Sequence, residues 1–286
     1  MRLRTRTAYA FLTPYMLIFL AFWIWPIANS FWLSFLNTRT ANWTFNPRMT
    51  WGRLLVDPAF ANALWNTLII LVIQVPIMIA LATVLAALLN SSMLRARGLF
   101  RFAFFAPVVV GEVAYAAVFR LMFNHEFGII NKMLAAVDVP AITWFASPNA
   151  AMAVIIIALT WRWAGYNAII ILAGLQSIPE DVYEAATLDG VSKTRQFLFI
   201  TLPLLRPVIV LCVVISVIGT MQLFSEPFLI TNRGGPGQAT ETLGLFLYRQ
   251  GFGAFNFGYA SAIAYTIAAL AVAISALNLW LGKERQ

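Results

Sequence analysis

Residues 184–203, EAATLDGVSKTRQFLFITLP, form a polar segment between two long apolar stretches of the chain. The segment opens with one acidic residue and two alanines, continues through Gly190, and closes at Pro203. Glycine commonly ends a helix because it tolerates a left-handed backbone. The pattern therefore predicts a short helix, a turn at Gly190 and a second helix capped by Ser192. In an otherwise apolar chain, such a segment favours contact with a soluble partner over contact with lipid.

The residues on either side of this segment predict where its helices start and stop. Ser177 and Glu180 have the S-x-x-E spacing of a capping box, and Pro179 suits the first helical turn. Acidic residues at this point also favour the positive end of the helix dipole. At the other end, Pro203 and Pro207 are expected to break or kink the chain.

The composition indicates a membrane protein. Of the 286 residues, 61% are hydrophobic and 10% are charged, whereas soluble domains average about 45–50% and about 25%. So few charges cannot cover the surface in water, and lipid must therefore be the solvent for much of it. The net charge of +8 comes from basic residues beside apolar stretches, which points to membrane topology rather than to nucleic acid.

Six segments are long and apolar enough to cross a bilayer, since a spanning helix needs about 20 mostly apolar residues. Helices are expected because lipid leaves every backbone polar group to be paired internally. We therefore predict an all-α membrane protein with one transmembrane domain, residues 1–286. The first apolar run is too long for a signal peptide and is expected to be retained. The approximate spans are 10–36, 63–89, 102–123, 150–175, 205–226 and 257–281.

The basic residues predict the orientation of these spans, because cytoplasmic loops carry an excess of lysine and arginine. Both termini and the loop 176–204 are therefore expected in the cytoplasm. The outer loops are then 37–62, 124–149 and 227–256. The basic residues on the expected cytoplasmic side are Arg2, Arg4, Arg6, Arg95, Arg97, Arg101, Lys193, Arg195, Arg206, Lys283 and Arg285.

The residue inventory argues against catalysis on this chain. One cysteine, Cys212, allows no internal disulfide, and one histidine, His125, allows no multi-histidine metal site. The sequence has no G-x-x-x-x-G-K-[ST] phosphate loop, so ATP hydrolysis is not expected here. A membrane enzyme would need catalytic side chains gathered at one depth, and the sequence offers no such cluster. We therefore expect no catalytic residues, metal or bound cofactor.

The 184–203 segment fits the pattern EAA, three residues, Gly, nine residues and I-x-L-P without a gap. This pattern resembles the signature loop of permease subunits of binding-protein-dependent ABC importers. The chain is similar to the carbohydrate-uptake branch, which includes the maltose and glycerol-phosphate permeases. Many relatives have T-x-G-G-P, whereas this chain has two residues between Thr231 and Gly234. Further matches are LAGLQSIPEDVYEAA at 172–186, FGIINKML at 127–134 and GGPGQAT at 234–240.

The resemblance implies the type I ABC importer permease fold in a bacterial inner or plasma membrane. The helix around Glu184–Asp189 would be the coupling helix, which sits in a cleft of an ATPase subunit. A second, homologous permease chain would complete the pore, and two ATPase subunits would bind ATP and magnesium. A periplasmic or lipid-anchored binding protein would deliver the solute. The implied coupling residues are Glu184, Ala185, Ala186, Asp189, Gly190 and Pro203.

Two ionisable residues fall inside predicted spans, where charge is costly and usually functional. Glu112 in the third span and Arg162 in the fourth lie near mid-depth, and these spans run in opposite directions, so the two side chains can meet. They form either a structural ion pair or part of a wet cavity that binds solute, and both interpretations stay open. Arg162 also has the charge to attract an anionic group on a sugar, such as a sulfonate or phosphate.

Aromatic and amide side chains surround Arg162 in the stretch TWRWAGYN, 160–167. Sugars bind to such mixtures, although aromatic residues also serve in helix packing. Gln222 and Glu226 are expected at the outer end of the fifth span, with Pro227 ending the helix. Asn66 and Gln74 are expected to make packing hydrogen bonds. The candidate pathway residues are Glu112, Tyr115, Trp161, Arg162, Trp163, Tyr166, Asn167, Gln222 and Glu226.

The predicted function is the pore subunit of an ATP-driven importer for a sugar or sugar derivative. A permease for another small polar solute is the first alternative. An ion-coupled secondary transporter is the second, but it needs intramembrane coupling groups, often in repeated halves. The sequence shows few such groups, and an ion gradient would not explain the 184–203 segment.

Overall fold

The computed structural model describes residues 2–40, 42–91 and 94–283. These residues are mostly helical, which confirms the all-α prediction, and they include one short antiparallel ribbon of β1 (Leu36–Asn37) and β2 (Thr44–Phe45). The chain divides into two compact units, residues 1–60 with 246–268 and residues 61–245 with 269–286. The expectation of a single domain stays a prediction. The orientation of the spans also stays a prediction, and one of the basic residues behind it, Arg285, lies outside the described residues.

In the first unit, one long helical segment corresponds to the first predicted span. It consists of α1 (Arg2–Phe19), a π-helical turn at Leu20–Ile24 and α2 (Trp25–Leu33). Pro26 explains the wide turn, because proline has no N–H and its ring clashes with the carbonyl four residues earlier. The Trp25 amide instead reaches back five residues to the Leu20 carbonyl. The apolar part of the segment, Tyr9–Leu33, leaves its side chains exposed, as lipid contact requires.

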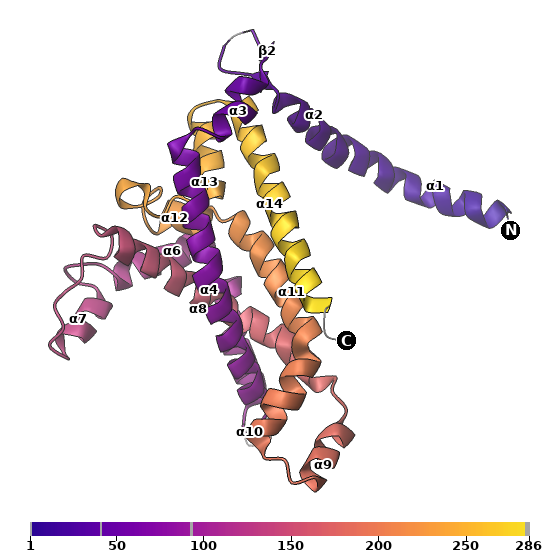
Figure 1. The fold of residues 1–286 in the computed structure, drawn as a ribbon, viewed down its shortest axis with the longest axis vertical. Coiled ribbons are helices and arrows are strands. Elements are labelled where there is room, and N and C mark those ends of the chain that lie inside the picture. The colour runs from indigo at the N-terminus through magenta and orange to yellow at the C-terminus, as the bar shows by residue number, and fades with distance from the viewer. Residues whose placement is uncertain (1, 41, 92–93, 284–286) are drawn as a thin grey trace. The chain divides into compact units, whose positions relative to one another are not determined.

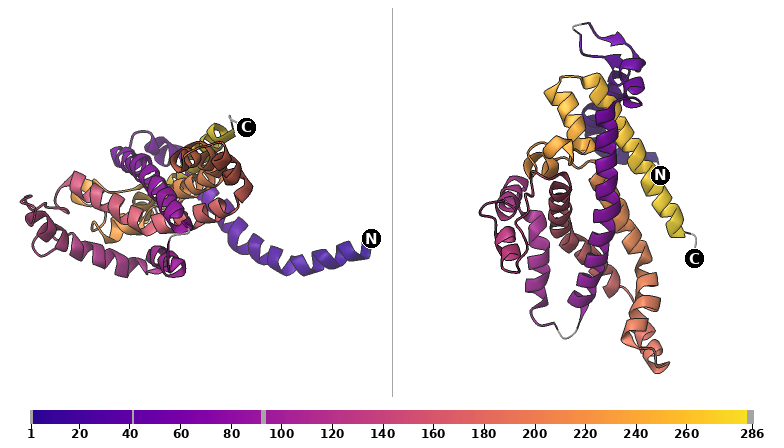
Figure 2. Two further views of the ribbon diagram at one scale, coloured as in Figure 1. Left: turned by 90° about the horizontal axis from the view of Figure 1, so that it is seen from below. Right: turned by 60° about the vertical axis from the view of Figure 1, so that its left-hand side comes forward.

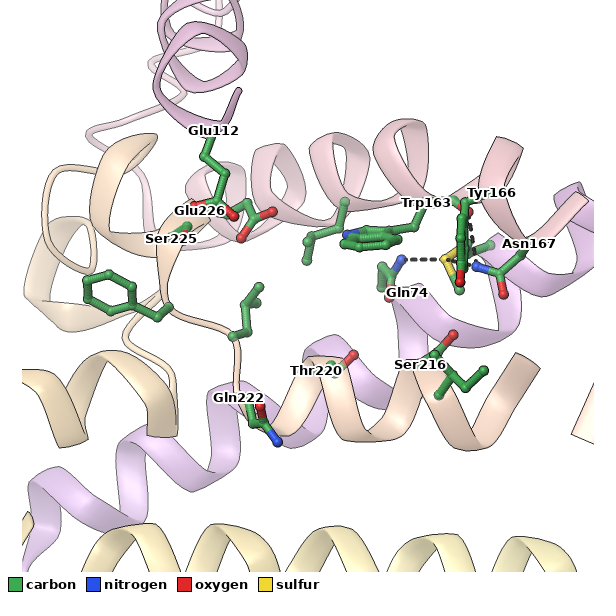
Figure 3. A pocket seen from close by; sticks show the side chains of 16 residues that line it. Gln74, Glu112, Trp163, Tyr166, Asn167, Ser216, Thr220, Gln222, Ser225 and Glu226 are labelled. Carbon is green, nitrogen blue, oxygen red and sulfur yellow. Dashed lines mark hydrogen bonds between the residues drawn. The ribbon is translucent and has the colours of Figure 1, made fainter. Parts of the chain in front are cut away.

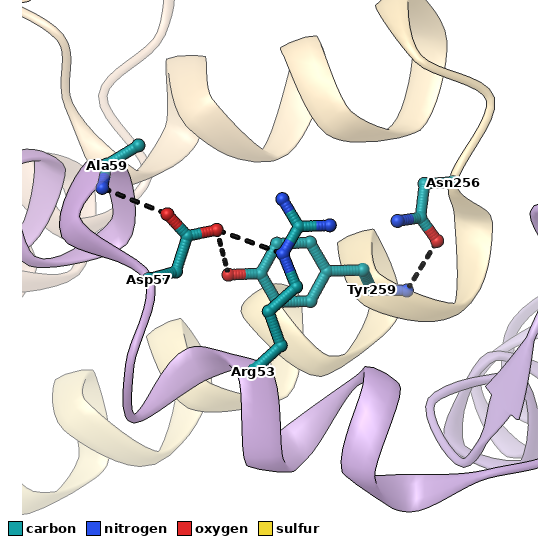
Figure 4. Close-up of polar contacts among 5 residues, drawn as sticks. All are labelled: Arg53, Asp57, Ala59, Asn256 and Tyr259. Carbon is teal, nitrogen blue, oxygen red and sulfur yellow. Dashed lines mark hydrogen bonds and ion pairs between the residues drawn. The ribbon is translucent and has the colours of Figure 1, made fainter.

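The start of helix α4 (Pro58–Asn90) is tied to the start of α14 (Phe257–Lys283) by Asp57 (Figure 4). Asp57 accepts hydrogen bonds from the Ala59 amide at 2.9 Å, from Arg53 Nε at 3.1 Å and from Tyr259 Oη at 3.0 Å. The Arg53 guanidinium also lies 4.2 Å from the centre of the Tyr259 ring. Asp57 thus caps one helix and holds a second one with the same carboxylate.

The second unit holds the spans from the second to the fifth, and the sixth span, α14, is divided between the two units. Figures 1 and 2 show the course of these helices. The helices of the second unit include most of α4, α8 (Pro148–Gln176) and α11 (Leu202–Met221), which contain or overlap the predicted spans 63–89, 150–175 and 205–226. Short helices α9 (Glu180–Leu188) and α10 (Lys193–Gln196) lie at one end of α11, and α12 (Ser225–Leu229) lies at the other. Further short helices of this unit are α7 (Ile129–Ala135) and η4 (Pro236–Gln238), whereas η2 (Pro47–Met49), α3 (Trp51–Leu54) and η5 (Arg249–Gly253) belong to the first unit and α13 (Leu243–Tyr248) lies at the boundary.

The third predicted span, 102–123, is not one continuous helix. It consists of α5 (Arg97–Val109) and α6 (Glu112–Met122), which meet at a bend of 97°. Val110 and Gly111 take extended backbone angles between them, which interrupts the helical hydrogen bonds. The described chain therefore has five helices long and apolar enough to span a membrane, or six when the bent pair counts as one. Glu112 consequently begins a helix, whereas the sequence placed it in the middle of one.

The fifth predicted span also differs from the sequence prediction. Residues Lys193–Met221 form one helical segment, so Pro203 does not separate α10 from α11. A π-helical turn at Phe197–Thr201 widens the helix just before this proline. The helix then ends at Met221, before Gln222, and Pro227 lies inside α12 rather than ending the span.

The core of the second unit lies around α8, whose crossing with α5 depends on Gly165. A Cβ atom at Gly165 would overlap the backbone carbonyl of Phe104, so only glycine allows this approach. Buried side chains of α4, α6, α8 and the segment after α11 pack into one apolar cluster. Its members are Ile70, Tyr115, Ala116, Phe119, Phe123, Met152, Val154, Ile155, Ala158, Leu159, Leu223 and Ile230.

Two loops of the second unit are ordered by buried amide side chains. Asn131 donates to the carbonyls of His125 and Ile142 and accepts from Trp144 Nε1, all within about 3.0 Å. Asn66 donates to the carbonyls of Gln238 and Glu241, both at 3.0 Å. Asn66 therefore makes the kind of packing hydrogen bond that the sequence suggested, and it fixes the glycine-rich loop at 234–240.

Candidate functional site

The first candidate site is the hairpin of residues 180–203, which contains the EAA pattern. Helix α9 ends in a glycine turn, where Gly190 has φ +73°. The Gly190 amide bonds to the Thr187 carbonyl and the Val191 amide bonds to the Ala186 carbonyl, each at 3.0 Å. This pair of bonds is a Schellman motif, which satisfies carbonyls left open at the helix end. The predicted helix, glycine turn and second helix are thus present.

Two details of the predicted capping are wrong. Ser177 ends α8 and its hydroxyl donates to the Gly174 carbonyl at 2.7 Å, so it does not cap α9. Pro179 takes the N-cap position of α9 instead. Ser192 does occupy the N-cap position of α10, but without a capping bond from its side chain. The rigid proline at the helix start replaces the serine cap.

Side-chain hydrogen bonds hold the two arms of the hairpin together. The buried Gln196 amide donates to Thr187 Oγ1 at 3.1 Å and to the Val191 carbonyl at 2.9 Å. The hydroxyls of Tyr183 and Thr201 lie 3.0 Å apart. The sequence pattern did not single out these four side chains, although a glutamine between charged residues and an apolar run is a weak signal. The two arms of the hairpin are therefore bonded to each other by side chains as well as joined by the glycine turn.

The predicted coupling residues divide into inward-facing and outward-facing positions. Ala186 is buried against the hairpin, which explains why a small residue stands there. The exposed members are Glu184, Ala185, Asp189, Gly190 and Pro203. Leu188 is also exposed, with 89% of its surface open, which leaves an apolar side chain on the outer face of α9.

The second candidate site is a cavity of about 430 Å³ in the second unit (Figure 3). It lies among α4, the start of α6, α8, the second half of α11 and the segment that leads into α12. The bend in the third span and the early end of α11 both border it. The lining residues are Gln74, Met78, Glu112, Leu159, Trp163, Tyr166, Asn167, Ile215, Ser216, Gly219, Thr220, Gln222, Leu223, Phe224, Ser225 and Glu226.

Six of the nine candidate pathway residues line this cavity, and three do not. The six are Glu112, Trp163, Tyr166, Asn167, Gln222 and Glu226. Trp161 instead stacks on Tyr115, with ring centres 6.0 Å apart, and Tyr115 is buried in the apolar cluster. Arg162 is buried beneath this group, and its guanidinium lies 4.8 Å from the centre of the Tyr115 ring. These three residues contact one another and are not part of the cavity lining.

Four further polar residues line the cavity and were not among the candidates. They are Gln74 on α4, Ser216 and Thr220 on α11, and Ser225 at the start of α12. The Gln74 amide donates to the sulfur of Met78 at 3.3 Å, a weak bond that matches its expected packing role. Ser216 and Thr220 stand four residues apart in an apolar helix, and this spacing places both on one face. That spacing was the available sequence signal for them.

Glu112 and Arg162 approach each other, with Arg162 Nη2 4.0 Å from Glu112 Oε1. The pair is asymmetric, because the Arg162 side chain is 8% exposed and that of Glu112 is 54% exposed. At this distance the contact is an ion pair rather than a short hydrogen bond. Glu112 lines the cavity and also lies beside the buried arginine, so its position fits both interpretations and both stay open.

Long apolar helices around a polar cavity, with a rigid polar hairpin at the end of one span, define a membrane transport component. The chain matches the family model described as "Binding-protein-dependent transport system inner membrane component" over residues 4–283. The protein belongs to this family and is an inner-membrane component of such a transport system. The resemblance drawn from the 184–203 segment is thereby confirmed.

Known relatives share most of their length with this chain. The lactose transport system permease protein of Rhizobium radiobacter is 41% identical over 280 residues, covering 96% of this chain and 94% of the relative. The sulfoquinovosyl glycerol transport system permease protein of Agrobacterium fabrum is 36% identical over 225 residues, covering 78% and 72%. A chain of a bacterial ABC transporter involved in the import of the acidic polysaccharide alginate has a TM-score of 0.85 at 21% identity, covering 99% and 97%. That structural match confirms the ABC importer permease fold.

Proposed function

We propose that this protein is the permease subunit of an ATP-driven importer for a sugar, and that it forms half of the transport pathway. The relatives with names that state a solute transport sugars or sugar derivatives. The observation that carries the proposal is the cavity, which combines an aromatic face at Trp163 with neutral hydrogen-bonding groups. Sugars present C–H faces and hydroxyl groups to such sites.

The energy for transport would come from partner chains. Two ATPase subunits would bind ATP and magnesium and receive the 180–203 hairpin in a cleft. A second homologous permease chain would complete the pore, and a periplasmic or lipid-anchored binding protein would deliver the sugar. The exposed face of α9, with Glu184, Ala185 and Leu188, is the surface available to an ATPase. The bonded arms of the hairpin would carry the motion into α11, which lines the cavity.

The role of this chain in the cycle would be to favour different pore conformations as the ATPases close and open. A partner shifts such an equilibrium only by its differential affinity for the two states. The hairpin is where ATPase closure would act, and the cavity is where solute would be released or retained. Helix α11 would link the hairpin to the cavity, since its first residues belong to the hairpin and its second half borders the cavity.

Reconstitution of the full transporter into proteoliposomes tests this proposal. Uptake of a labelled neutral disaccharide such as lactose should require ATP, the binding protein and this chain. Collapse of ion gradients with ionophores should leave that uptake intact. Uptake driven by an ion gradient without ATP would instead support the secondary transporter. Stimulation of ATP hydrolysis by amino acids or inorganic anions, with no response to any sugar, would overturn the sugar assignment.

A further inference from the structure

The charged groups that face the cavity are acidic. Among the described residues that line it, Glu112 and Glu226 are ionisable carboxylates, and arginine and lysine are absent. Figure 3 shows the two side chains beside each other at one end of the cavity, where α6 begins and α12 follows α11. Glu226 is buried, with 6% of its surface exposed, so water screens its charge poorly.

Arg162 is the nearest cation to these acids, and its charge is already engaged. Its Nη2 atom lies 4.0 Å from Glu112, and its guanidinium lies 4.8 Å from the Tyr115 ring centre and 5.9 Å from that of Trp163. Trp163 lines the cavity, whereas Arg162 is buried and is not part of the lining. The Nε and Nη1 atoms of Arg162 are buried without hydrogen-bond partners, so an anionic group in the cavity would meet the carboxylates of the lining rather than this guanidinium.

The balance of charge follows from these three groups. With both carboxylates ionised, the group of Glu112, Glu226 and Arg162 carries one net negative charge. With one carboxylate protonated, the group is neutral. Neither state offers a net positive charge to a sulfonate, phosphate or uronate. A buried anion needs a paired cation or dedicated hydrogen-bond donors, whereas the charged residues of the cavity wall are themselves anions.

Building on the proposed function, we propose that this cavity selects uncharged, hydroxyl-rich sugars and discriminates against anionic ones. Carboxylates accept strong hydrogen bonds from hydroxyl groups, so Glu112 and Glu226 would bind sugar hydroxyls at one end. Asn167, Thr220 and Gln222 supply neutral donors and acceptors elsewhere along the wall. The solutes named for the similar proteins include both neutral and acidic sugars, so similarity alone does not choose between them. For this chain, the choice of a neutral sugar rests on the charge of the cavity lining.

Lactose and its 6′-sulfate form a matched pair of probes, because they differ in one anionic group. Binding of each to the purified permease–ATPase complex without binding protein reports on the cavity alone. We expect lactose to bind on the order of tenfold more tightly than the sulfate. Glu226→Gln and Glu112→Gln should each narrow that ratio. Glu126→Gln is the matched control, because Glu126 is exposed and is not part of the cavity lining.

Each outcome has a defined consequence. The proposed selectivity is wrong if the sulfated sugar binds as tightly as lactose or more tightly. If that binding is lost in Arg162→Gln, Arg162 binds the anion. In that case the assignment as a sugar permease still holds. An unchanged ratio in both glutamate variants would also overturn the proposed selectivity. If Glu226→Gln fails to fold, Glu112→Gln still tests the idea, because Glu112 is half-exposed at the start of a helix. If neither sugar binds and neither is transported, the proposed function itself fails.

Discussion

Gly165 on α8 lies against the backbone carbonyl of Phe104 on α5, so closely that a methyl group has no room between them. This contact sets how the fourth span crosses the first half of the third. It therefore holds one wall of the cavity, since Trp163 and Tyr166 flank Gly165 in sequence and line the cavity.

Replacing Gly165 with alanine should separate α5 from α8 and destabilise the protein by about 1–3 kcal/mol, as overpacking typically does. The change would be measured as a lower midpoint of thermal unfolding in detergent, with the loss of monodisperse protein on heating as the signal. Gly98→Ala is the control, because a Cβ there meets nothing within 4 Å. Equal midpoints for wild type and the Gly165 variant would show that the crossing tolerates the extra atom.

Replacing Gly190 with valine should uncouple ATP hydrolysis from transport or prevent ATPase assembly. Its φ of +73° is left-handed, and such a conformation costs an ordinary residue about 1–2 kcal/mol. Membrane insertion should persist, because Gly190 lies before the helical segment Lys193–Met221 that would span the membrane. Gly190→Asn should retain more coupling than valine, because asparagine tolerates this conformation better. Fully coupled uptake by the valine variant would contradict the role of the turn.

Replacing Gln196 with leucine should weaken the link between the two arms of the hairpin. The change removes the donors to Thr187 Oγ1 and to the half-buried Val191 carbonyl, and loss of such bonds typically costs about 1 kcal/mol each. Because motion would then be absorbed within the hairpin, the ratio of sugar transported to ATP hydrolysed should fall. Thr194→Val is the control at an exposed neighbouring position. An equal loss of both rates would instead indicate a merely unstable protein.

A double-mutant cycle on Glu112 and Arg162 separates the two interpretations of this pair. Their contact is long and Glu112 is half-exposed, so the coupling energy in thermal stability should be below about 1 kcal/mol. Arg162→Gln should be the more damaging single change, because that side chain is buried and packs on Tyr115. Full rescue of transport by a charge swap, with selectivity unchanged, would show instead that the pair is structural.

The Asp57 carboxylate should contribute stability that depends on pH. Burial works to raise the Asp57 pKa, but hydrogen bonds from Tyr259, Ala59 and Phe60, together with Arg53, hold that pKa below its ordinary value. A lowered pKa means that the stabilisation is complete above the unfolded-state pKa of about 4 and is lost as the pH falls through the folded value.

Asp57→Asn should therefore lower stability at neutral pH by about 1 kcal/mol, the usual cost of a lost helix cap. The difference in stability between this variant and the wild type should shrink as the pH falls below about 4, because the wild-type carboxylate then loses its charge. Thermal midpoints measured from pH 3 to pH 7 would check this, with the exposed Asp138→Asn as control. A difference that stays constant across that range would show that ionisation of Asp57 does not contribute.

Much of the site could be predicted because its signals are local. The helix, the turn at Gly190 and the second helix follow from residue types that act within one or two turns. The capping prediction failed because Pro179 and Ser177 compete for the same helix start, and spacing alone does not decide between them. The cavity was found only in part, since Ser216 and Thr220 belong to one span and Gln74 to another. Which faces of those spans meet depends on helix packing.

The membrane class, the number of apolar segments, the EAA hairpin and the family could all be predicted without coordinates. These properties depend on composition, run length and nearby spacing, which the chain carries without any tertiary contact. The three-dimensional structure was needed to find that the third span bends by 97° before Glu112, that the helix of the fifth ends at Met221, and that Glu112 and Glu226 line one cavity while Arg162 does not. Spacing along the chain does not show which side chains of separate spans meet, and that meeting decides the charge of the cavity lining.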